Sequence, residues 1–184
     1  MTRSMYGFAL GGMVLMATGC GTYQVIPEHL EDRVRTDLSF DQVAQNPGAH
    51  EGDTIMWGGK VLAVNRIEGK TRVEILHLPL DGVHCPIDAP TASRGRYMAV
   101  DRGREIESPG SLPKDTLVTV IGEVRGIVNA PLDQGQYAYP HIAIRDMTAW
   151  EKQTGVRHTP PGAQMHGYRP FVFWDSRRVV GRDK

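Results

Sequence analysis

The sequence predicts a mainly β protein, either a small curled sheet or an OB-like five-stranded barrel, with one short helix. Short runs that alternate apolar and polar residues follow one another between residues 54 and 150, and turn-forming residues separate them. A glycine pair, Gly58-Gly59, lies inside the first run. Such a pair commonly marks a bend where a sheet curls toward closure. A helix-start signal stands ahead of these runs, at Ser39.

The short helix is expected to begin directly after Ser39. Ser39 and Gln42 have the spacing of a capping box, in which the serine oxygen accepts a backbone N–H and the glutamine reaches back to the N-cap amide. Asn46-Pro47-Gly48 should end the helix after about two turns. Because so short a helix is marginal alone, Phe40 and Val43 are expected to pack against the rest of the protein.

The strands are expected to be short and five in number. The fourth has the most regular pattern, which places Val118, Val120, Gly122 and Val124 on one face. Residues 79–90 contain three prolines and are expected to form an irregular loop. The expected strands cover residues 54–63, 71–78, 96–100, 116–125 and 141–150.

Length and charge exclude several classes of protein. A chain of 184 residues is of the size of one domain. Its 21 basic and 21 acidic side chains leave no net charge, so the broad basic surface of a nucleic-acid-binding protein is not expected. Two cysteines cannot build a disulfide framework, and they lack zinc-finger spacing. After residue 20, no run approaches the ~20 apolar residues that span a bilayer.

The first 20 residues have the order of a secretory signal. One basic side chain, Arg3, precedes an uncharged apolar run that ends in small residues. The sequence Ala17-Thr18-Gly19-Cys20 resembles a bacterial lipobox, in which the cysteine thiol receives a diacylglycerol group and becomes the first residue of the mature protein. The alternative is an ordinary secretory signal that happens to stand before a cysteine. The lipobox is the favoured interpretation, with Cys20 as the site of lipid attachment.

The chain is therefore expected to divide into four parts. They are a signal peptide (1–19), a lipidated tether of low order (20–37), a β-domain (38–152) and an irregular C-terminal tail (153–184). The tail contains an apolar cluster with Phe171, Phe173 and Trp174, followed by a basic end. This cluster could form a terminal strand that closes the sheet, or it could contact a membrane or a partner protein.

Candidate catalytic chemistry is sparse. The His84-Cys85 pair is the one place where a thiol and an imidazole are adjacent, but catalytic Cys and His are usually distant in sequence, so an inert, partly buried thiol is expected. A less favoured alternative is a metal or thiol enzyme that uses His77, His84, Cys85 and His141. Neither phosphate-binding glycine motif is present. The sequence predicts no enzyme, no cofactor and no resident metal.

An OB-like sheet could hold an envelope glycan or peptide on its exposed face, which is an argument from fold alone. The candidate contacts on that face are Trp57, Tyr97 and Arg125. The competing interpretation is that the two aromatic residues pack in the core and that the arginine is solvated.

An ordered series of short motifs resembles the Slp family of starvation-inducible outer-membrane lipoproteins. The resemblance covers about residues 38–152, behind the lipobox. It implies a protein of the cell envelope that is anchored in the outer membrane through lipid (palmitate-type) chains on Cys20, faces the periplasm and has no assigned catalytic residues. Partners are then the membrane and an envelope protein or glycan. The motifs are Trp57-Gly58-Gly59-Lys60-Val61, Leu78-Pro79-Leu80-Asp81, Gly95-Arg96-Tyr97-Met98-Ala99, Leu112-Pro113 with residues 118–124, and Tyr139-Pro140 ahead of Trp150.

Overall fold

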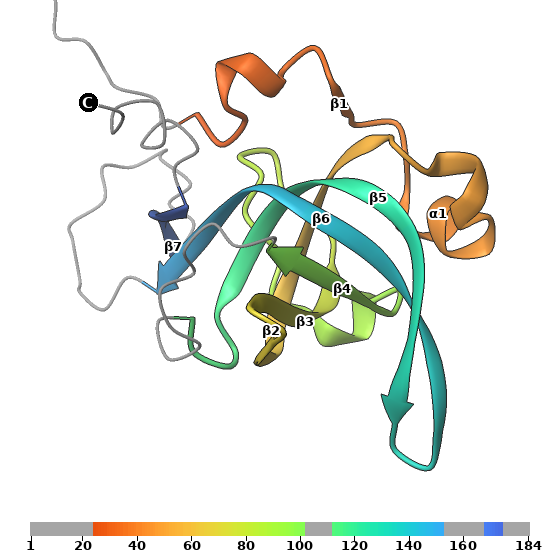
Figure 1. Ribbon diagram of the computed structural model, residues 1–184. Coiled ribbons are helices and arrows are strands. Elements are labelled where there is room, and N and C mark those ends of the chain that lie inside the picture. Colours follow the sequence, from red (N-terminus) through yellow and green to blue (C-terminus); the bar gives the residue numbers. More distant parts are fainter. Residues whose placement is uncertain (1–23, 102–111, 153–167, 175–184) are drawn as a thin grey trace, which may run out of the picture.

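The computed structural model describes residues 24–101, 112–152 and 168–174, and for Arg169 and residues 171–174 it describes the backbone alone. Strands make up most of this part of the chain (Figure 1). The elements are, in chain order, η1 (Glu28–Leu30), β1 (Val34–Arg35), α1 (Phe40–Gln45), η2 (Pro47–His50), β2 (Thr54–Ile67), β3 (Lys70–Leu78), η3 (Pro90–Ala92), β4 (Arg96–Asp101), β5 (Leu117–Leu132), β6 (Gly135–Lys152) and β7 (Tyr168–Trp174).

Five strands pair in a closed ring. The ring runs β2-β3-β4-β6-β5 and returns to β2, because β2 pairs with β3 along one edge and with β5 along the other. All of these pairs are antiparallel except β4 with β6. Going around the ring, its five strands therefore stand in the order first, second, third, fifth and fourth of their succession along the chain. The prediction of a mainly β fold with one short helix is confirmed.

The main core fills the inside of this ring. Alternate side chains of the strands point inward and are almost completely buried, including Val118, Val120 and Val124 of the predicted fourth strand. Helix α1 packs onto the same core through Phe40 and Val43, which confirms the expected contact. The predicted capping box is also present, since the Ser39 hydroxyl accepts from the Gln42 amide and the Gln42 side chain bonds to the Ser39 amide.

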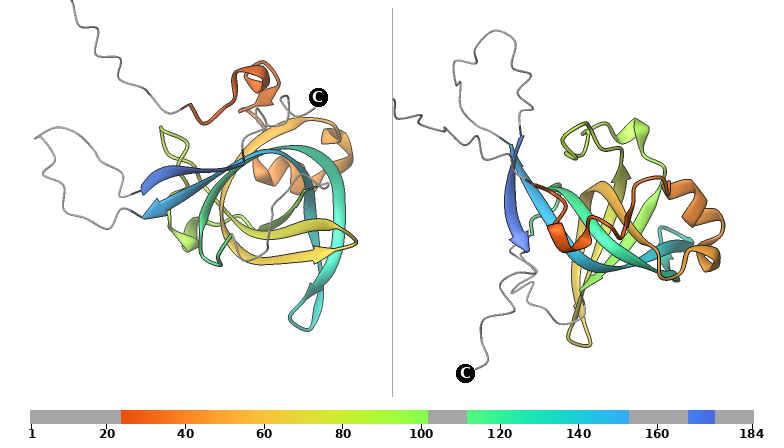
Figure 2. Two further views of the ribbon diagram at one scale, coloured as in Figure 1. Left: turned by 60° about the vertical axis from the view of Figure 1, so that its left-hand side comes forward. Right: turned by 90° about the horizontal axis from the view of Figure 1, so that it is seen from above.

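The β5–β6 hairpin extends well beyond the prediction. The sequence predicted strands over 116–125 and 141–150, whereas the two strands continue to a tight turn at Asp133 and Gln134. Figure 2 shows this hairpin projecting from the ring. Along the outer half of β5, half-buried residues alternate with exposed ones and none is fully buried, so the alternation that marks a half-buried strand is weak there.

Order begins earlier than expected at the N-terminal side. Residues 24–37, which were predicted as part of a tether of low order, contain η1 and the short strand β1, which pairs in parallel with the start of β2. Val25 and Leu30 are buried. Val25 belongs to a second apolar cluster outside the ring, together with Leu78, Cys85, Leu117 and Trp150. The N-terminal segment is thus held against the domain from its second described residue onward.

The backbone of the predicted C-terminal aromatic cluster forms a strand. Strand β7 pairs antiparallel with the C-terminal part of β6, with Ala149 opposite Phe171 and Trp150 opposite Pro170. A terminal strand is thus present, but it pairs with β6 alone and does not close the sheet, and contact of this cluster with a membrane or a partner stays a prediction. The side chains of Phe171, Phe173 and Trp174 lie outside the described part of the structure.

Candidate functional site

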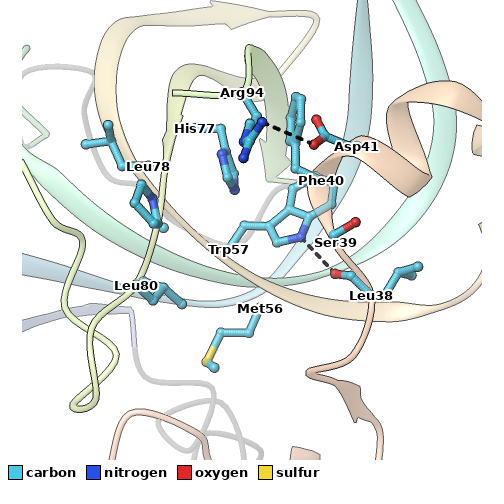
Figure 3. A pocket seen from close by; sticks show the side chains of 12 residues that line it. Leu38, Ser39, Phe40, Asp41, Met56, Trp57, His77, Leu78, Leu80 and Arg94 are labelled. Atoms are coloured by element: carbon cyan, nitrogen blue, oxygen red, sulfur yellow. Dashed lines mark hydrogen bonds and ion pairs between the residues drawn. The ribbon is translucent and has the colours of Figure 1, made fainter. Parts of the chain in front are cut away.

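A groove opens where helix α1 meets one end of the ring, and it has a volume of about 290 Å³. We call it the aromatic groove, because three ring side chains form its wall (Figure 3). It lies between the start of α1, the first part of β2 and the end of β3. The lining residues are Leu38, Ser39, Phe40, Asp41, Met56, Trp57, Gly58, His77, Leu78, Pro79, Leu80 and Arg94.

The three rings are packed against one another. The centroid of Phe40 lies 4.6 Å from that of His77 and 5.2 Å from that of Trp57, and the Trp57 and His77 rings meet edge to face at 6.0 Å. The Trp57 indole N–H also donates to the Leu38 carbonyl at 3.5 Å, which ties β2 to the residues ahead of α1. Such tilted contacts fix the orientation of the rings, so the wall is preformed.

His77 gives the groove a neutral polar group. The pKa of His77 is lowered from 6.5 to about 4, mainly by burial; Asp41 acts in the opposite direction, and Arg94 adds to the lowering. The imidazole is therefore uncharged at neutral pH. Its Nδ1 atom is buried and has no hydrogen-bond partner among the residues that the structure describes. A buried polar atom without a hydrogen-bond partner costs free energy. A ligand that supplied a hydrogen-bond partner for this atom would therefore gain affinity.

Charged groups of the groove lie at its rim. Arg94 and Asp41 form an ion pair of 3.9 Å, and both side chains are exposed. Because this pair is solvated and the imidazole is neutral, the groove presents apolar and aromatic surface with one buried hydrogen-bonding atom. This arrangement suits an uncharged apolar or aromatic group, and no nucleophile paired with a base lies along its wall.

The structure brings together two of the three predicted ligand-face residues. Trp57 and Tyr97 meet edge to face with centroids 5.4 Å apart, but Tyr97 is fully buried and Trp57 is only 4% exposed. Both therefore pack in the core, and Trp57 alone also borders the groove. Arg125 lies apart on β5, does not line the groove, and pairs with Glu123 at 2.9 Å. The expected common face of these three residues is not formed.

The structure gives the thiol alternative no support. Cys85 is 2% exposed, and burial raises the pKa of its thiol to about 12, with Asp81 adding to the effect. A thiol that stays protonated at neutral pH is a poor nucleophile. Within residues 24–101, 112–152 and 168–174, no three His, Cys, Asp or Glu side chains converge as metal ligands, so His77, His84, Cys85 and His141 do not form one site.

Sequence reasoning identified parts of the groove but not the groove itself. Phe40 was expected in the core and Trp57 on a ligand face, while His77 was considered only as a metal ligand. Met56 and Arg94 were not singled out. The motif Leu78-Pro79-Leu80-Asp81 was the available signal, because its first three residues line the groove.

No helix in the described part of the chain is long and apolar enough to cross a bilayer. Cys20, the predicted site of lipid attachment, lies outside the described residues.

Comparison with known proteins identifies the family. A sequence model of the outer membrane lipoprotein Slp family matches residues 17–178. The lipoprotein YeaY of Escherichia coli K12 is 31% identical over 146 residues, which cover 78% of this chain and 72% of that protein. The outer membrane protein Slp of the same strain is 28% identical over 153 residues, which cover 81% and 77%. The resemblance predicted from the sequence is confirmed, and the chain belongs to the Slp family of outer membrane lipoproteins.

Proposed function

We propose that this outer-membrane lipoprotein is anchored through a lipid on Cys20, faces the periplasm and acts without catalysis, as a structural or binding protein of the envelope, including under starvation or other stress. The observation that carries the proposal is the family match, which begins at residue 17 and so includes the lipobox cysteine. The absence of an inner-membrane sorting aspartate after Cys20, where Gly21 stands, supports the outer membrane as its site.

Physical chemistry supports a lipid as the means of attachment. Each buried methylene of an acyl chain contributes about 0.8 kcal/mol, so a lipid with two or three chains holds a protein stably where one chain would be marginal. The neutral chain has no excess of basic side chains to hold it on an anionic surface. Attachment should therefore depend on Cys20.

Replacing Cys20 with alanine should abolish attachment. Without the thiol no diacylglycerol can be added, so we expect Cys20→Ala to move from the outer-membrane fraction to another fraction of the cell. Flotation of membranes followed by immunoblotting measures this. The matched control is Cys85→Ala, which removes the other cysteine and should leave the protein with the outer membrane. A Cys20→Ala protein that still floats with outer membranes would refute the lipid anchor.

The aromatic groove supports a second candidate function, the binding of an envelope peptide or glycan. The groove combines a preformed aromatic wall with the buried Nδ1 of a neutral imidazole. Its volume of about 290 Å³ is at the low end for small-molecule sites and would hold one aromatic or apolar side chain or one sugar ring. Stacking on Trp57 or Phe40 and one hydrogen bond to His77 would provide the recognition.

Binding in the groove predicts a specific loss of affinity. We expect peptidoglycan fragments that carry both sugar and peptide to perturb tryptophan fluorescence on titration. We expect His77→Phe to weaken that binding about fivefold, since one hydrogen bond contributes roughly 1 kcal/mol. Phenylalanine keeps a ring against Phe40 but lacks the nitrogen. Arg125→Ala, outside the groove, is the control and should bind normally. Equal affinities for the two variants, or no saturable signal, would remove the groove as the binding site.

A further inference from the structure

The loop of residues 80–87 carries two exposed aliphatic side chains, Val83 and Ile87, which are 50% and 46% exposed. We call it the apolar loop. Between them lies Cys85, which points the other way and is buried in the cluster outside the ring. The loop therefore exposes two apolar side chains to solvent while it buries the Cys85 side chain, which gives it an outward-facing apolar surface.

Hydrogen bonds hold this loop in one shape. The Asp81 carboxylate accepts from the backbone amides of Val83 and Cys85, both at 2.9 Å, and the Asp81 amide donates to the Cys85 carbonyl at 2.9 Å. The Thr119 hydroxyl of β5 donates to the His84 carbonyl at 2.6 Å and accepts from the Trp150 indole at 3.0 Å. The exposed aliphatic residues are therefore presented by a braced turn.

The apolar loop lies beside the start of the described chain. Cys85 and Val25 belong to the same apolar cluster, together with Trp150. Figures 1 and 2 show the loop next to the first described residues in all three views. The β2–β3 hairpin turn, which follows the exposed Ile67, lies on the opposite side of the ring in both views of Figure 2.

Chain length then limits how far this loop can be from the anchor. Five residues separate Cys20 from Val25, and an extended chain spans at most ~3.6 Å per residue, so the lipidated cysteine is within about 18 Å of Val25. A tether that ran to residue 37 would have allowed more than three times this distance. The ordered N-terminal segment thus brings one particular end of the domain to the bilayer.

The carboxylates of the loop and of the residue that follows it, Asp81 and Asp88, do not oppose such a contact. The Asp81 carboxylate is capped by two backbone amides. Asp88, just beyond the loop, forms an ion pair with Lys60. Both carboxylates would keep these partners when the loop approaches a layer of lipid headgroups. Their pairing lowers the free-energy cost of removing them from water.

We propose that the apolar loop is seated on the lipid surface of the leaflet that holds Cys20, with Val83 and Ile87 inserted among the headgroups. This inference rests on the proposed lipid anchor. Contact of the apolar loop with the lipid surface orients the domain, because it turns the β2–β3 hairpin toward the periplasm.

A depth-sensitive label tests the orientation. The lipidated full-length protein carrying Val83→Cys is labelled with the fluorophore NBD and placed in vesicles of phosphatidylethanolamine and phosphatidylglycerol. Ile67→Cys, labelled in the same way, is the matched control, because Ile67 is 43% exposed on the opposite side. The native Cys85 is buried, and labelling of the unsubstituted protein measures its background. Lipids that bear a nitroxide at the headgroup should quench the Val83→Cys label about twofold, since interfacial side chains lie ~5–10 Å deep, and should leave the Ile67→Cys label unchanged.

Three outcomes would overturn the proposal. Equal accessibility of the two labels on protein that floats with the vesicles means that the anchor works but no end of the domain is preferred. A blue shift at the Val83→Cys label without nitroxide quenching means that a protein surface covers the loop. Failure of the lipidated protein to float with the vesicles refutes the anchor itself, and this is measured separately from fluorescence.

Discussion

Replacing Gly59 with alanine is expected to lower the free energy of unfolding by about 3 kcal/mol. Gly59 lies in β2 at a position paired on both sides, with His77 of β3 and with Val118 of β5. A Cβ atom at this position would stand 2.6 Å from the Leu76 carbonyl oxygen and would overlap the Ile75 side chain. Because both neighbouring strands belong to the closed ring, neither can move aside alone.

The measurement is thermal or urea unfolding of the purified protein. For a domain of this size, 3 kcal/mol corresponds to a fall in melting temperature of about 10 °C. The control is Gly48→Ala in η2, where an added Cβ would have nothing within 4 Å and the backbone needs no positive φ. We expect this control to leave the free energy of unfolding unchanged or raise it by up to about 1 kcal/mol. Equal melting temperatures for the two variants would contradict the close approach of β2 and β3 at Gly59.

The same glycine shows what the sequence could predict about the fold. Gly58-Gly59 inside an alternating run predicted a curled sheet, and the structure supplies the physical reason, which is close contact between β2 and the backbone of β3. The inner halves of the strands were found because one face of each is buried. The outer half of the β5–β6 hairpin was not found, because β5 buries no residue fully there and its burial pattern is weak.

The aromatic groove could be predicted only in part, for a different reason. Phe40 and Trp57 are recognisable as apolar residues of a helix and a strand, but their contact with His77 depends on closure of the ring, and no local pattern encodes it. The polar character of the groove was equally hidden. Whether His77 is solvated depends on whether residues of α1 cover its ring, and the sequence around His77 does not show this.

Desolvation of His77 has a consequence for acid stability that the sequence does not reveal. The pKa of His77 is about 4 in the folded protein and about 6.5 in the unfolded chain. Between these values the unfolded state binds more protons than the folded state, so the free energy of unfolding rises with pH. The contribution of the neutral imidazole is complete above pH 6.5 and is lost as the pH falls toward 4. We expect a loss of about 2 to 3 kcal/mol over this range.

The variant His77→Phe isolates this contribution from the other titrating groups. Phenylalanine keeps a ring against Phe40 but cannot take up a proton, while Asp41 and Arg94 remain in place. Urea unfolding of both proteins at pH 7, 5 and 4 gives two stability curves, and carboxylates common to both proteins cancel in their difference. Between pH 7 and pH 4, we expect the free energy of unfolding of the unsubstituted protein to fall by about 2 to 3 kcal/mol more than that of His77→Phe. Parallel curves would mean that His77 is hydrated in the folded protein, and the same result would weaken the case for ligand binding in the groove.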